Sequence, residues 1–211
     1  NQVDKFEKKI KKYLKCKYAL TCNSGTSALF IAYQALGTNK KTNIIMPAIN
    51  FVASYRTARF FSSKIYLSDV DPVTGQMTPK NLVDCIKKFN LKKIDIVNTM
   101  YLGGNPFYIK EFFKLKKKYN FLLLEDSCHA FGSKYYFKNK SFQVGSCKHA
   151  DISTFSFHPL KTITTGEGGL ITMNNVNYYK TAKLVRSHGI ERNNDEYWKN
   201  KIEIEGMNFR L

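Results

Sequence analysis

The sequence contains no apolar run of the ~18 residues that a membrane-spanning helix requires. Its N-terminus, Asn-Gln-Val-Asp-Lys, lacks the apolar core of a secretion signal, and no internal repeat or low-complexity linker interrupts the chain. Hydrophobic residues make up 43% and aromatic residues 14% of the 211 positions, which is enough for one sizeable core. We therefore expect residues 1–211 to form a single folded domain without a membrane partner.

Cysteine is scarce and irregularly spaced. There are five cysteines, an odd number, and no Cys-x-x-Cys pair. This pattern argues against a disulfide framework and against a zinc site. We expect free thiols, no bound metal and a cytoplasmic location.

Acidic residues are also few: the chain has 16 Asp and Glu and 34 Lys and Arg, which gives a net charge of +18. Such a charge raises the question of a nucleic-acid partner. The two densest lysine runs, residues 8–12 and 114–118, lie in segments with apolar residues at helical spacing, so a solvated helix face explains them. No RNA-binding strand motif, zinc finger or helix-turn-helix is evident. We expect no nucleic-acid partner, whereas a small anionic ligand is compatible with this charge.

Strand and helix patterns alternate along the chain, which predicts an α/β fold with a mostly parallel central sheet and helices on both faces. The expected strands are residues 18–21, 43–46, 64–67, 94–97, 121–124, 152–157 and 169–173. The expected helices are residues 2–15, 24–36, 51–61, 78–89, 105–119 and 176–187.

Ligands of an open parallel sheet bind beyond the carboxyl ends of its strands, so the residues that follow each strand carry the functional interpretation. After the first strand, Gly25 would let the backbone approach a ligand, and the amides of Thr26 and Ser27 would lie at a helix N-terminus. Such a terminus binds phosphate well. The alternative is a plain serine cap with a turn glycine.

A carboxylate follows the most apolar strand. Asp126 stands where that buried strand ends, so it needs a strong partner, such as a cation on a ligand. The alternative is a cap for the segment that follows. His129, three residues later, could donate or accept a hydrogen bond at the same site, or it could be an ordinary structural histidine.

Lys161 lies in a Thr- and Gly-rich loop between two expected strands. A lysine in such surroundings can become a nucleophile, although a surface lysine is the simpler alternative. A phosphate site, a strand-end Asp and a reactive Lys are together what pyridoxal 5'-phosphate requires. The Lys forms a Schiff base, the Asp keeps the pyridine nitrogen protonated, and the phosphate binds at the helix N-terminus.

Seven segments, in order along nearly the whole chain, resemble the nucleotide-sugar aminotransferases of the DegT/DnrJ/EryC1/StrS family, which have the fold-type I architecture of pyridoxal-phosphate-dependent transferases. The segments are Ser24-Gly-Thr-Ser-Ala-Leu29, Pro47-Ala-Ile-Asn-Phe-Val-Ala-Ser54, Asp69-Val-Asp71, Glu125-Asp-Ser-Cys-His-Ala130, Phe155-Ser-Phe-His-Pro-Leu-Lys161 with Thr165-Gly-Glu-Gly-Gly169, Arg186-Ser-His-Gly189 and Gly206-Met-Asn-Phe-Arg-Leu211.

The resemblance implies two catalytic residues. Lys161 would bond to the cofactor and move the proton between substrate and cofactor, and Asp126 would pair with the pyridine nitrogen. His129 matches a position beside the cofactor's 3-hydroxyl, and Phe51 matches an aromatic residue that stacks on its ring.

The resemblance also implies a phosphate site and a partner. The Ser156 hydroxyl would bind the phosphate together with Gly25, Thr26 and Ser27. Asn208 matches a residue that reaches the phosphate of the neighbouring subunit, which implies a homodimer.

Lys161 also bears on the type of reaction, because relatives that deoxygenate sugars carry His at this position. The wording of the motifs is most similar to the branch that aminates C4 of a UDP-linked 4-keto-6-deoxy N-acetylhexosamine on the route to pseudaminic acid, with glutamate as the usual donor. Another keto-sugar nucleotide as substrate, or a non-catalytic regulator with the same fold, are the alternatives.

Two departures from the family pattern are evident. Asn50 stands where Thr is common. The family's chains continue past the position of Leu211 into a smaller C-terminal domain, so the resemblance implies that residues 1–211 are a cofactor-binding large domain and a fragment of a longer protein, with the small domain missing.

Overall fold

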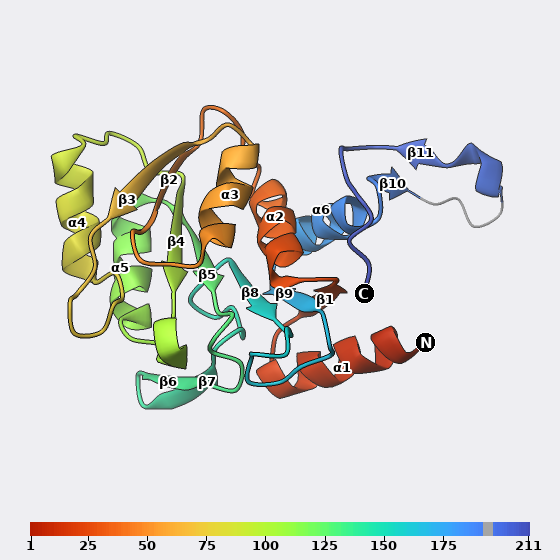
Figure 1. Cartoon of the computed structure of the whole chain (residues 1–211), viewed down its shortest axis with the longest axis horizontal. Coiled ribbons are helices and arrows are strands. Elements are labelled where there is room, and N and C mark those ends of the chain that lie inside the picture. The colour runs from red at the N-terminus through yellow and green to blue at the C-terminus, as the bar shows by residue number, and fades with distance from the viewer. Residues whose placement is uncertain (192–195) are drawn as a thin grey trace.

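The computed structural model describes residues 1–191 and 196–211, and a seven-stranded sheet forms its centre (Figure 1). The strands lie in the order β1 (Tyr18–Cys22), β9 (Gly169–Met173), β8 (Ile152–Ser156), β5 (Leu122–Asp126), β4 (Ile96–Met100), β2 (Asn43–Pro47) and β3 (Lys64–Ser68). Only β9 runs opposite to the other strands of this sheet, because it pairs antiparallel with both β1 and β8. The predicted mostly parallel α/β sheet is confirmed.

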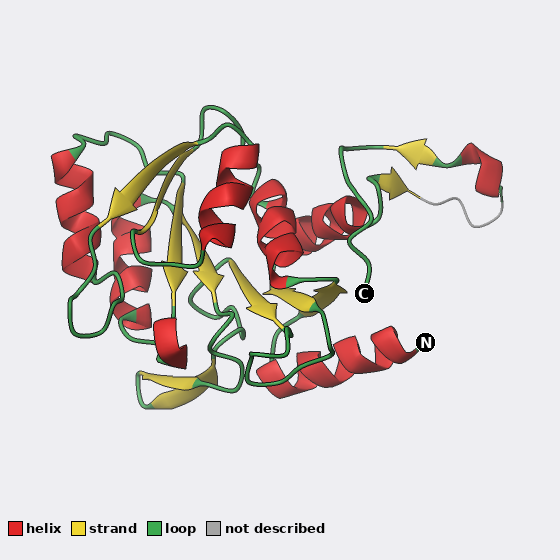
Figure 2. Ribbon diagram, in the orientation of Figure 1, coloured by secondary structure: helices red, strands yellow, loops and turns green. Residues whose placement is uncertain are grey.

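Helices cover both faces of the sheet (Figure 2). On one face lie α2 (Gly25–Ala35), α3 (Val52–Phe60) and α6 (Val176–Arg186), which share one apolar cluster with the sheet. On the other face lie α1 (Gln2–Leu14), α4 (Pro79–Lys88) and α5 (Ile109–Tyr119). Strands β4, β8 and β9 are buried along their whole length, as expected of central strands covered on both sides, although β4 and β8 also carry Asn, Ser or Thr.

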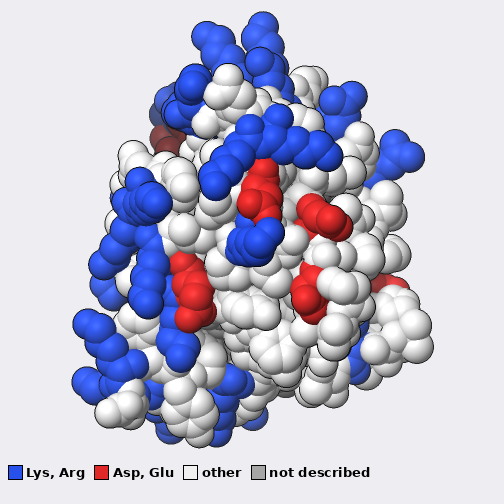
Figure 3. All heavy atoms as spheres, turned by 90° about the vertical axis from the view of Figure 1, so that its left-hand side faces the viewer, with Lys and Arg blue, Asp and Glu red and all other residues white. Residues whose placement is uncertain are grey.

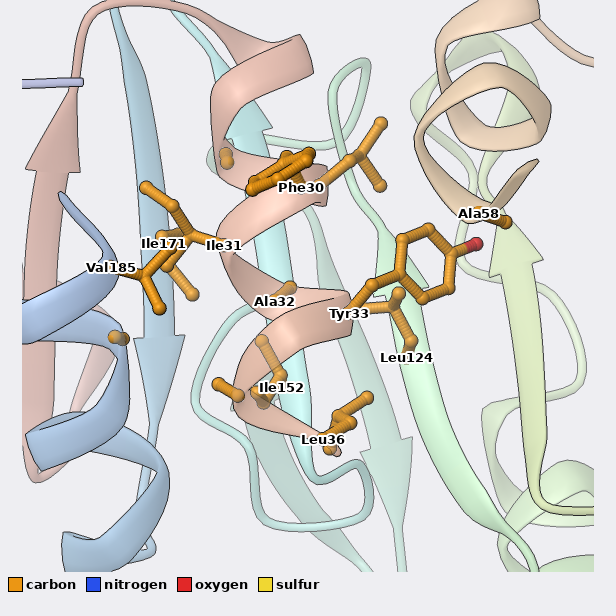
Figure 4. Close-up of a cluster of buried hydrophobic side chains, with 14 of the residues drawn as sticks. Phe30, Ile31, Ala32, Tyr33, Leu36, Ala58, Leu124, Ile152, Ile171 and Val185 are labelled. Carbon is orange, nitrogen blue, oxygen red and sulfur yellow. The ribbon is translucent and has the colours of Figure 1, made fainter. Parts of the chain in front are cut away.

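Helix α2 is the most deeply buried helix of the core. Its apolar residues point in all directions, so it packs against both neighbouring helices and the sheet. In Figure 4, Ile31 faces Ile171 and Val185 on one side of the helix, while Tyr33 lies beside Leu124 on the other. The helix ends before Gly37, whose φ of 77° is the left-handed conformation that glycine adopts readily.

Several local expectations differ from the structure. The strand expected at residues 94–97 is β4, which begins at Ile96 and runs to Met100, because its pairing with β5 spans those residues. The helix expected from Asn105 begins at Ile109 instead, after Tyr108 in the left-handed region with φ 62°. The carbonyl oxygen of Asn105 accepts hydrogen bonds from the buried Gln76 side chain (3.0 Å) and from the Phe107 amide (3.0 Å) instead of from a helical amide, so a tertiary contact and a local turn take the place of the expected first turn. Residues 102–104 form a separate short 3₁₀ turn.

A further difference is the presence of two small two-stranded sheets that the sequence did not indicate. Strands β6 (Lys134–Phe137) and β7 (Lys140–Gln143) are joined by Lys138 and Asn139, both with positive φ, as in a tight hairpin turn. Strands β10 (Ile190–Glu191) and β11 (Lys201–Ile202) form the other pair. Within residues 1–191 and 196–211, none of the helices combines the length and the apolar character needed to cross a membrane.

Lysine and arginine side chains are spread over the face shown in Figure 3, with acidic side chains between them. Lys80 pairs with Asp84 at 2.6 Å, and Lys116 of the dense α5 run pairs with Asp151 at 2.6 Å. Its neighbours Lys117 and Lys118 are exposed. This lysine run therefore lies on a solvent-exposed face of α5, as predicted.

Candidate active site

The carboxyl ends of all the parallel strands meet at one edge of the sheet, and the antiparallel β9 begins there. The register places Gly169 opposite Cys22 on one side and Ser156 on the other. One strand further along, Asp126 of β5 stands opposite Thr154 of β8. The segments that follow β1, β5 and β8 are therefore neighbours in space, although they are far apart in the sequence.

Gly25 makes one of these close approaches. A Cβ atom on this glycine would lie 2.8 Å from the Cβ of Ser156 and 3.3 Å from the sulfur of Cys128. Real Cβ atoms essentially never approach another heavy atom within 3.0 Å, so a larger residue would push the start of α2 away from β8. The absence of a side chain at Gly25 is what brings the α2 N-terminus next to the Ser156 hydroxyl.

The first turn of α2 holds itself together through Ser24. Its side chain accepts a hydrogen bond from the Ser27 amide at 3.0 Å, and the Ser27 hydroxyl donates to Asn23 Oδ1 at 2.6 Å. Both polar groups of Ser27 are thus engaged within the turn. The Gly25 and Thr26 amides precede the first helical hydrogen bond, which Ala28 donates to the Ser24 carbonyl, so they are the donors that point out of the helix end.

Asp126 lies at the end of β5 and is only 3% exposed. The Ser54 hydroxyl donates to its Oδ2 at 2.7 Å, and the Cys128 amide donates to its Oδ1 at 3.2 Å. Within the described residues, the partners of this buried carboxylate are therefore the Ser54 hydroxyl and the Cys128 amide. The contact with the Cys128 amide corresponds to the alternative role predicted for Asp126, a cap for the following segment. Each carboxylate oxygen accepts one hydrogen bond here, so each keeps a lone pair for a ligand cation.

Lys161 lies in the loop between β8 and β9 and is partly buried. Its backbone amide donates to the His158 carbonyl at 2.9 Å. The Lys161 charge influences the pKa values of His129 and Cys128, which follow Asp126 in the chain. Burial lowers the pKa of His129 below 6.5 and the Lys161 charge lowers it further, while the Asp126 charge acts in the opposite direction. His129 and Asp126 therefore lie in the same electrostatic environment as the Lys161 charge.

Cys128 belongs to this site, although no feature of the sequence distinguishes it from the other cysteines. Burial raises the pKa of its thiol well above the ordinary value, and the Asp126 charge raises it further. The nearby Lys161 charge opposes this shift. The side chain therefore stays a neutral thiol between the carboxylate and the α2 N-terminus.

Ser54 is a second residue that the sequence did not reveal as part of the site. Only the contact with Asp126, 72 residues away in the sequence, identifies it. Two signals were available: Ser54 closes the segment 47–54 that carries the resemblance, and it lies four residues after Asn50, a spacing at which side chains at a helix start face each other. The Asn50 side-chain amide does donate to the Ser54 hydroxyl at 3.0 Å.

Phe51 is the N-cap residue of α3 and is 71% exposed. Its backbone amide donates to Asn50 Oδ1 at 2.7 Å. Ile49 and Val52 beside it are also exposed. Phe51 and Val52 border an apolar hollow together with Pro47 at the end of β2. A large aromatic side chain in this position is available to contact a ligand.

Asn208 lies in the last segment of the chain and is exposed. It pairs with Ser187 in an isolated antiparallel bridge. The next residue, Phe209, accepts a hydrogen bond from the Asn23 amide at 2.9 Å through its carbonyl oxygen. The segment that contains Asn208 therefore runs beside the turn that precedes Gly25.

Comparison with known proteins finds similarity along the whole chain. The family model described as "DegT/DnrJ/EryC1/StrS aminotransferase family" matches residues 1–211. A UDP-4-amino-4,6-dideoxy-N-acetyl-beta-L-altrosamine transaminase from Campylobacter jejuni subsp. jejuni serotype O:23/36 (strain 81-176) is 38% identical over 210 residues, which cover 100% of this chain and 53% of that protein.

Solved structures give the same result. Helicobacter pylori PseC, an aminotransferase involved in the biosynthesis of pseudoaminic acid, superposes with a TM-score of 0.87 at 29% identity, covering 100% of this chain and 54% of that chain. NtdA from Bacillus subtilis with bound cofactor PMP superposes with a TM-score of 0.86 at 25% identity, covering 100% and 45% of the two chains. The chain thus spans about half the length of the relatives it matches.

Proposed function

The chain belongs to the DegT/DnrJ/EryC1/StrS aminotransferase family, and we propose that its protein is a pyridoxal-5'-phosphate-dependent aminotransferase that transfers an amino group from an amino acid to C4 of a UDP-linked 4-keto-6-deoxy N-acetylhexosamine. The observation that carries this proposal is the convergence of Lys161, Asp126 and the α2 N-terminus on one edge of the sheet.

The residues at this edge fit pyridoxal phosphate. The close contact of Gly25 with Ser156 leaves a helix N-terminus and a hydroxyl side by side, which suits a phosphate group. The buried Asp126 has lone pairs left for a protonated ring nitrogen. When bound, this cofactor supplies an aldehyde for attachment to an amine and a ring that stabilises negative charge on the reacting carbon.

Lys161 and Asp126 are the proposed catalytic residues. The Lys161 amine would hold the cofactor covalently and afterwards carry the proton between the substrate carbon and the cofactor. The Asp126 carboxylate would keep the ring nitrogen protonated, and the buried Ser54 hydroxyl already orients it. His129, with its lowered pKa, would meet the 3-hydroxyl as a neutral imidazole.

The remaining proposed contacts hold the cofactor in place. Ser156 and the amides of Gly25 and Thr26 would bind the phosphate, with Ser27 holding the turn. The exposed Phe51 would stack on the ring.

We further propose that residues 1–211 form one cofactor-binding domain and that the protein acts as a homodimer. In that dimer, the exposed Asn208 would reach the phosphate site of the neighbouring subunit. The five free cysteines suit a cytoplasmic protein.

The names of the relatives support the substrate. The Campylobacter jejuni relative is a transaminase of a UDP-linked 4-amino-4,6-dideoxy sugar, and PseC takes part in pseudoaminic acid biosynthesis. Glutamate is the proposed donor. Another keto-sugar nucleotide is the second candidate for the same site, and a non-catalytic regulator that retains the cofactor pocket is the alternative from a different class.

Chemical trapping tests the cofactor assignment. The full-length protein is loaded with pyridoxal phosphate, reduced with borohydride and digested for peptide mapping. We expect the cofactor on Lys161. A label on another lysine, or no label, would contradict the proposal.

An amination assay then separates the substrates. The full-length protein is incubated with glutamate and a panel of UDP-linked and other nucleotide-linked keto sugars. Amination of the UDP-linked 4-keto N-acetylhexosamine above all others supports the proposal, whereas preference for another sugar selects the second candidate. Lys161 labelling without turnover of any sugar would favour a regulator.

A further inference from the structure

A short chain of hydrogen bonds leads from the start of α3 to Asp126. The Asn50 side-chain amide donates to the Ser54 hydroxyl at 3.0 Å, and the Ser54 hydroxyl donates to Asp126 Oδ2 at 2.7 Å. At its other end, Asn50 Oδ1 accepts the Phe51 amide at 2.7 Å. One network therefore joins the residue proposed to stack on the ring with the carboxylate proposed to meet the ring nitrogen.

The direction of the Ser54 hydrogen bond follows from the chemistry of a hydroxyl, which has one proton to donate. Because the Ser54 oxygen accepts the Asn50 amide, its own proton is directed to Asp126. Serine and threonine within helices often donate instead to the carbonyl one turn earlier, as Thr57 does to Ala53 at 2.7 Å in this same helix.

The environment makes this contact strong. Ser54 is fully buried and Asp126 is 3% exposed, so water does not compete for the hydrogen bond. With Ser54 on Oδ2 and the Cys128 amide on Oδ1, both oxygens are held, and the carboxylate plane is fixed. A carboxylate held in this way needs no rearrangement to meet a cation on a ligand.

We propose that Ser54 and Asn50 are positioning residues for the ring-nitrogen contact of the cofactor: Asn50 orients the Ser54 hydroxyl, and that hydroxyl holds the Asp126 carboxylate in the plane that receives the protonated nitrogen. This proposal rests on the proposed function, because it assumes that Asp126 meets the pyridine nitrogen.

The test compares two probes that differ at the ring nitrogen. Pyridoxal 5'-phosphate and its 1-deaza analogue, in which carbon replaces that nitrogen, are titrated into the full-length protein, and binding is followed by absorbance and by quenching of tryptophan fluorescence. In Ser54→Ala we expect affinity for pyridoxal phosphate to fall up to about tenfold, as for a lost hydrogen bond to a charged group. Affinity for the deaza analogue stays unchanged, because it has no nitrogen for Asp126 to meet.

Three further variants sharpen the test. Ser54→Thr keeps the hydroxyl and restores affinity. Asn50→Ala leaves the hydroxyl free to turn elsewhere and gives a smaller loss in the same direction. Thr57→Val removes a buried hydroxyl of the same helix that bonds only to backbone carbonyls, and it affects neither probe.

The outcomes separate the two levels of the proposal. If Ser54→Ala lowers the affinity for both probes equally, the role of Ser54 is merely structural. If it lowers neither affinity, the hydroxyl is dispensable. Either result overturns the positioning role while the proposed function stands. If the unmodified protein binds neither probe, the proposed function itself fails and the positioning role fails with it.

Discussion

Glu125 and Asp126 are neighbours in the sequence, yet their carboxylates lie on opposite faces of the sheet. Successive side chains of a strand alternate between faces, so Asp126 meets Ser54 of α3 at 2.7 Å, whereas Glu125 accepts a hydrogen bond from the Tyr101 hydroxyl at 2.6 Å and another from Ser153. Both side chains are only 3% exposed. Two adjacent buried carboxylates thus have separate surroundings and, we infer, separate roles.

Asp126→Asn tests the catalytic half of this pair. The amide keeps the shape of the side chain and can still accept the Ser54 hydrogen bond, but it cannot hold a proton on the ring nitrogen. We expect cofactor affinity to fall about tenfold and turnover of the full-length enzyme to fall about 10²- to 10³-fold. Steady-state rates and cofactor titration measure the two effects. Glu125→Gln is the matched control, and a loss as large in this variant would contradict the assignment.

Glu125 has a role in stability that depends on pH. Burial raises its pKa, although the hydrogen bonds from Ser153 and Tyr101 work in the opposite direction. With a raised pKa, the folded state takes up a proton at a higher pH than the unfolded state, so this group favours folding more as pH falls from neutral towards about 4.5. We expect the free energy of unfolding of the wild type to rise relative to Glu125→Gln between pH 7 and pH 5, measured by urea unfolding. A difference that is independent of pH would refute this.

Gly25→Ala tests the close approach between α2 and β8. The added methyl group would lie 2.8 Å from the Ser156 Cβ, so we expect a loss of about 1–3 kcal/mol in the free energy of unfolding. In a Ser156→Gly background that atom is absent, and the same substitution should cost much less. Denaturant unfolding of the four proteins in this cycle measures the coupling. Equal costs in both backgrounds would show that the two residues do not collide.

His129 reports on the charge near Lys161. Its pKa is lowered by burial and then by the Lys161 charge, so the imidazole is neutral at pH 7 and takes up a proton only below pH 6.5. NMR titration of the histidine ring signals, assigned with His129→Gln, should give a midpoint below 6.5. Lys161→Ala removes the nearby charge, and the midpoint should move upward. No movement would place Lys161 away from this site.

The cysteines should resist thiol reagents in the folded protein. Burial raises the pKa of Cys16 to about 11 and those of Cys22 and Cys147 to about 12. The pKa values of Cys85 and Cys128 are raised as well. Because the thiolate is the reactive form, we expect slow labelling at pH 8 and rapid labelling of five thiols in denaturant. Fast labelling of Cys128 in the native protein, identified with Cys128→Ala, would show that its thiol ionises readily.

The sequence predicted the elements and the residues that follow them because their signals are local. The strand at Gly169–Met173 is where the apolar run indicates it, and Ser24 and Gly37 bound α2 as a cap and a turn glycine do. Strand β5 extends two residues beyond the predicted apolar run, through Asp126, because partners from other elements satisfy its polar end.

Chain order alone already placed Gly25, Asp126 and Lys161 after strands of one parallel sheet, and the carboxyl ends of such strands must meet at a common edge. The contacts made there depend on how the helices pack. Ser54 reaches Asp126 only because α3 lies on the same face as this side chain, and the Asn105 carbonyl, expected at a helix start, accepts a hydrogen bond from the Gln76 side chain instead. Local propensity acts over a few residues, whereas these hydrogen bonds join residues that only the packing of distant segments brings within 3 Å.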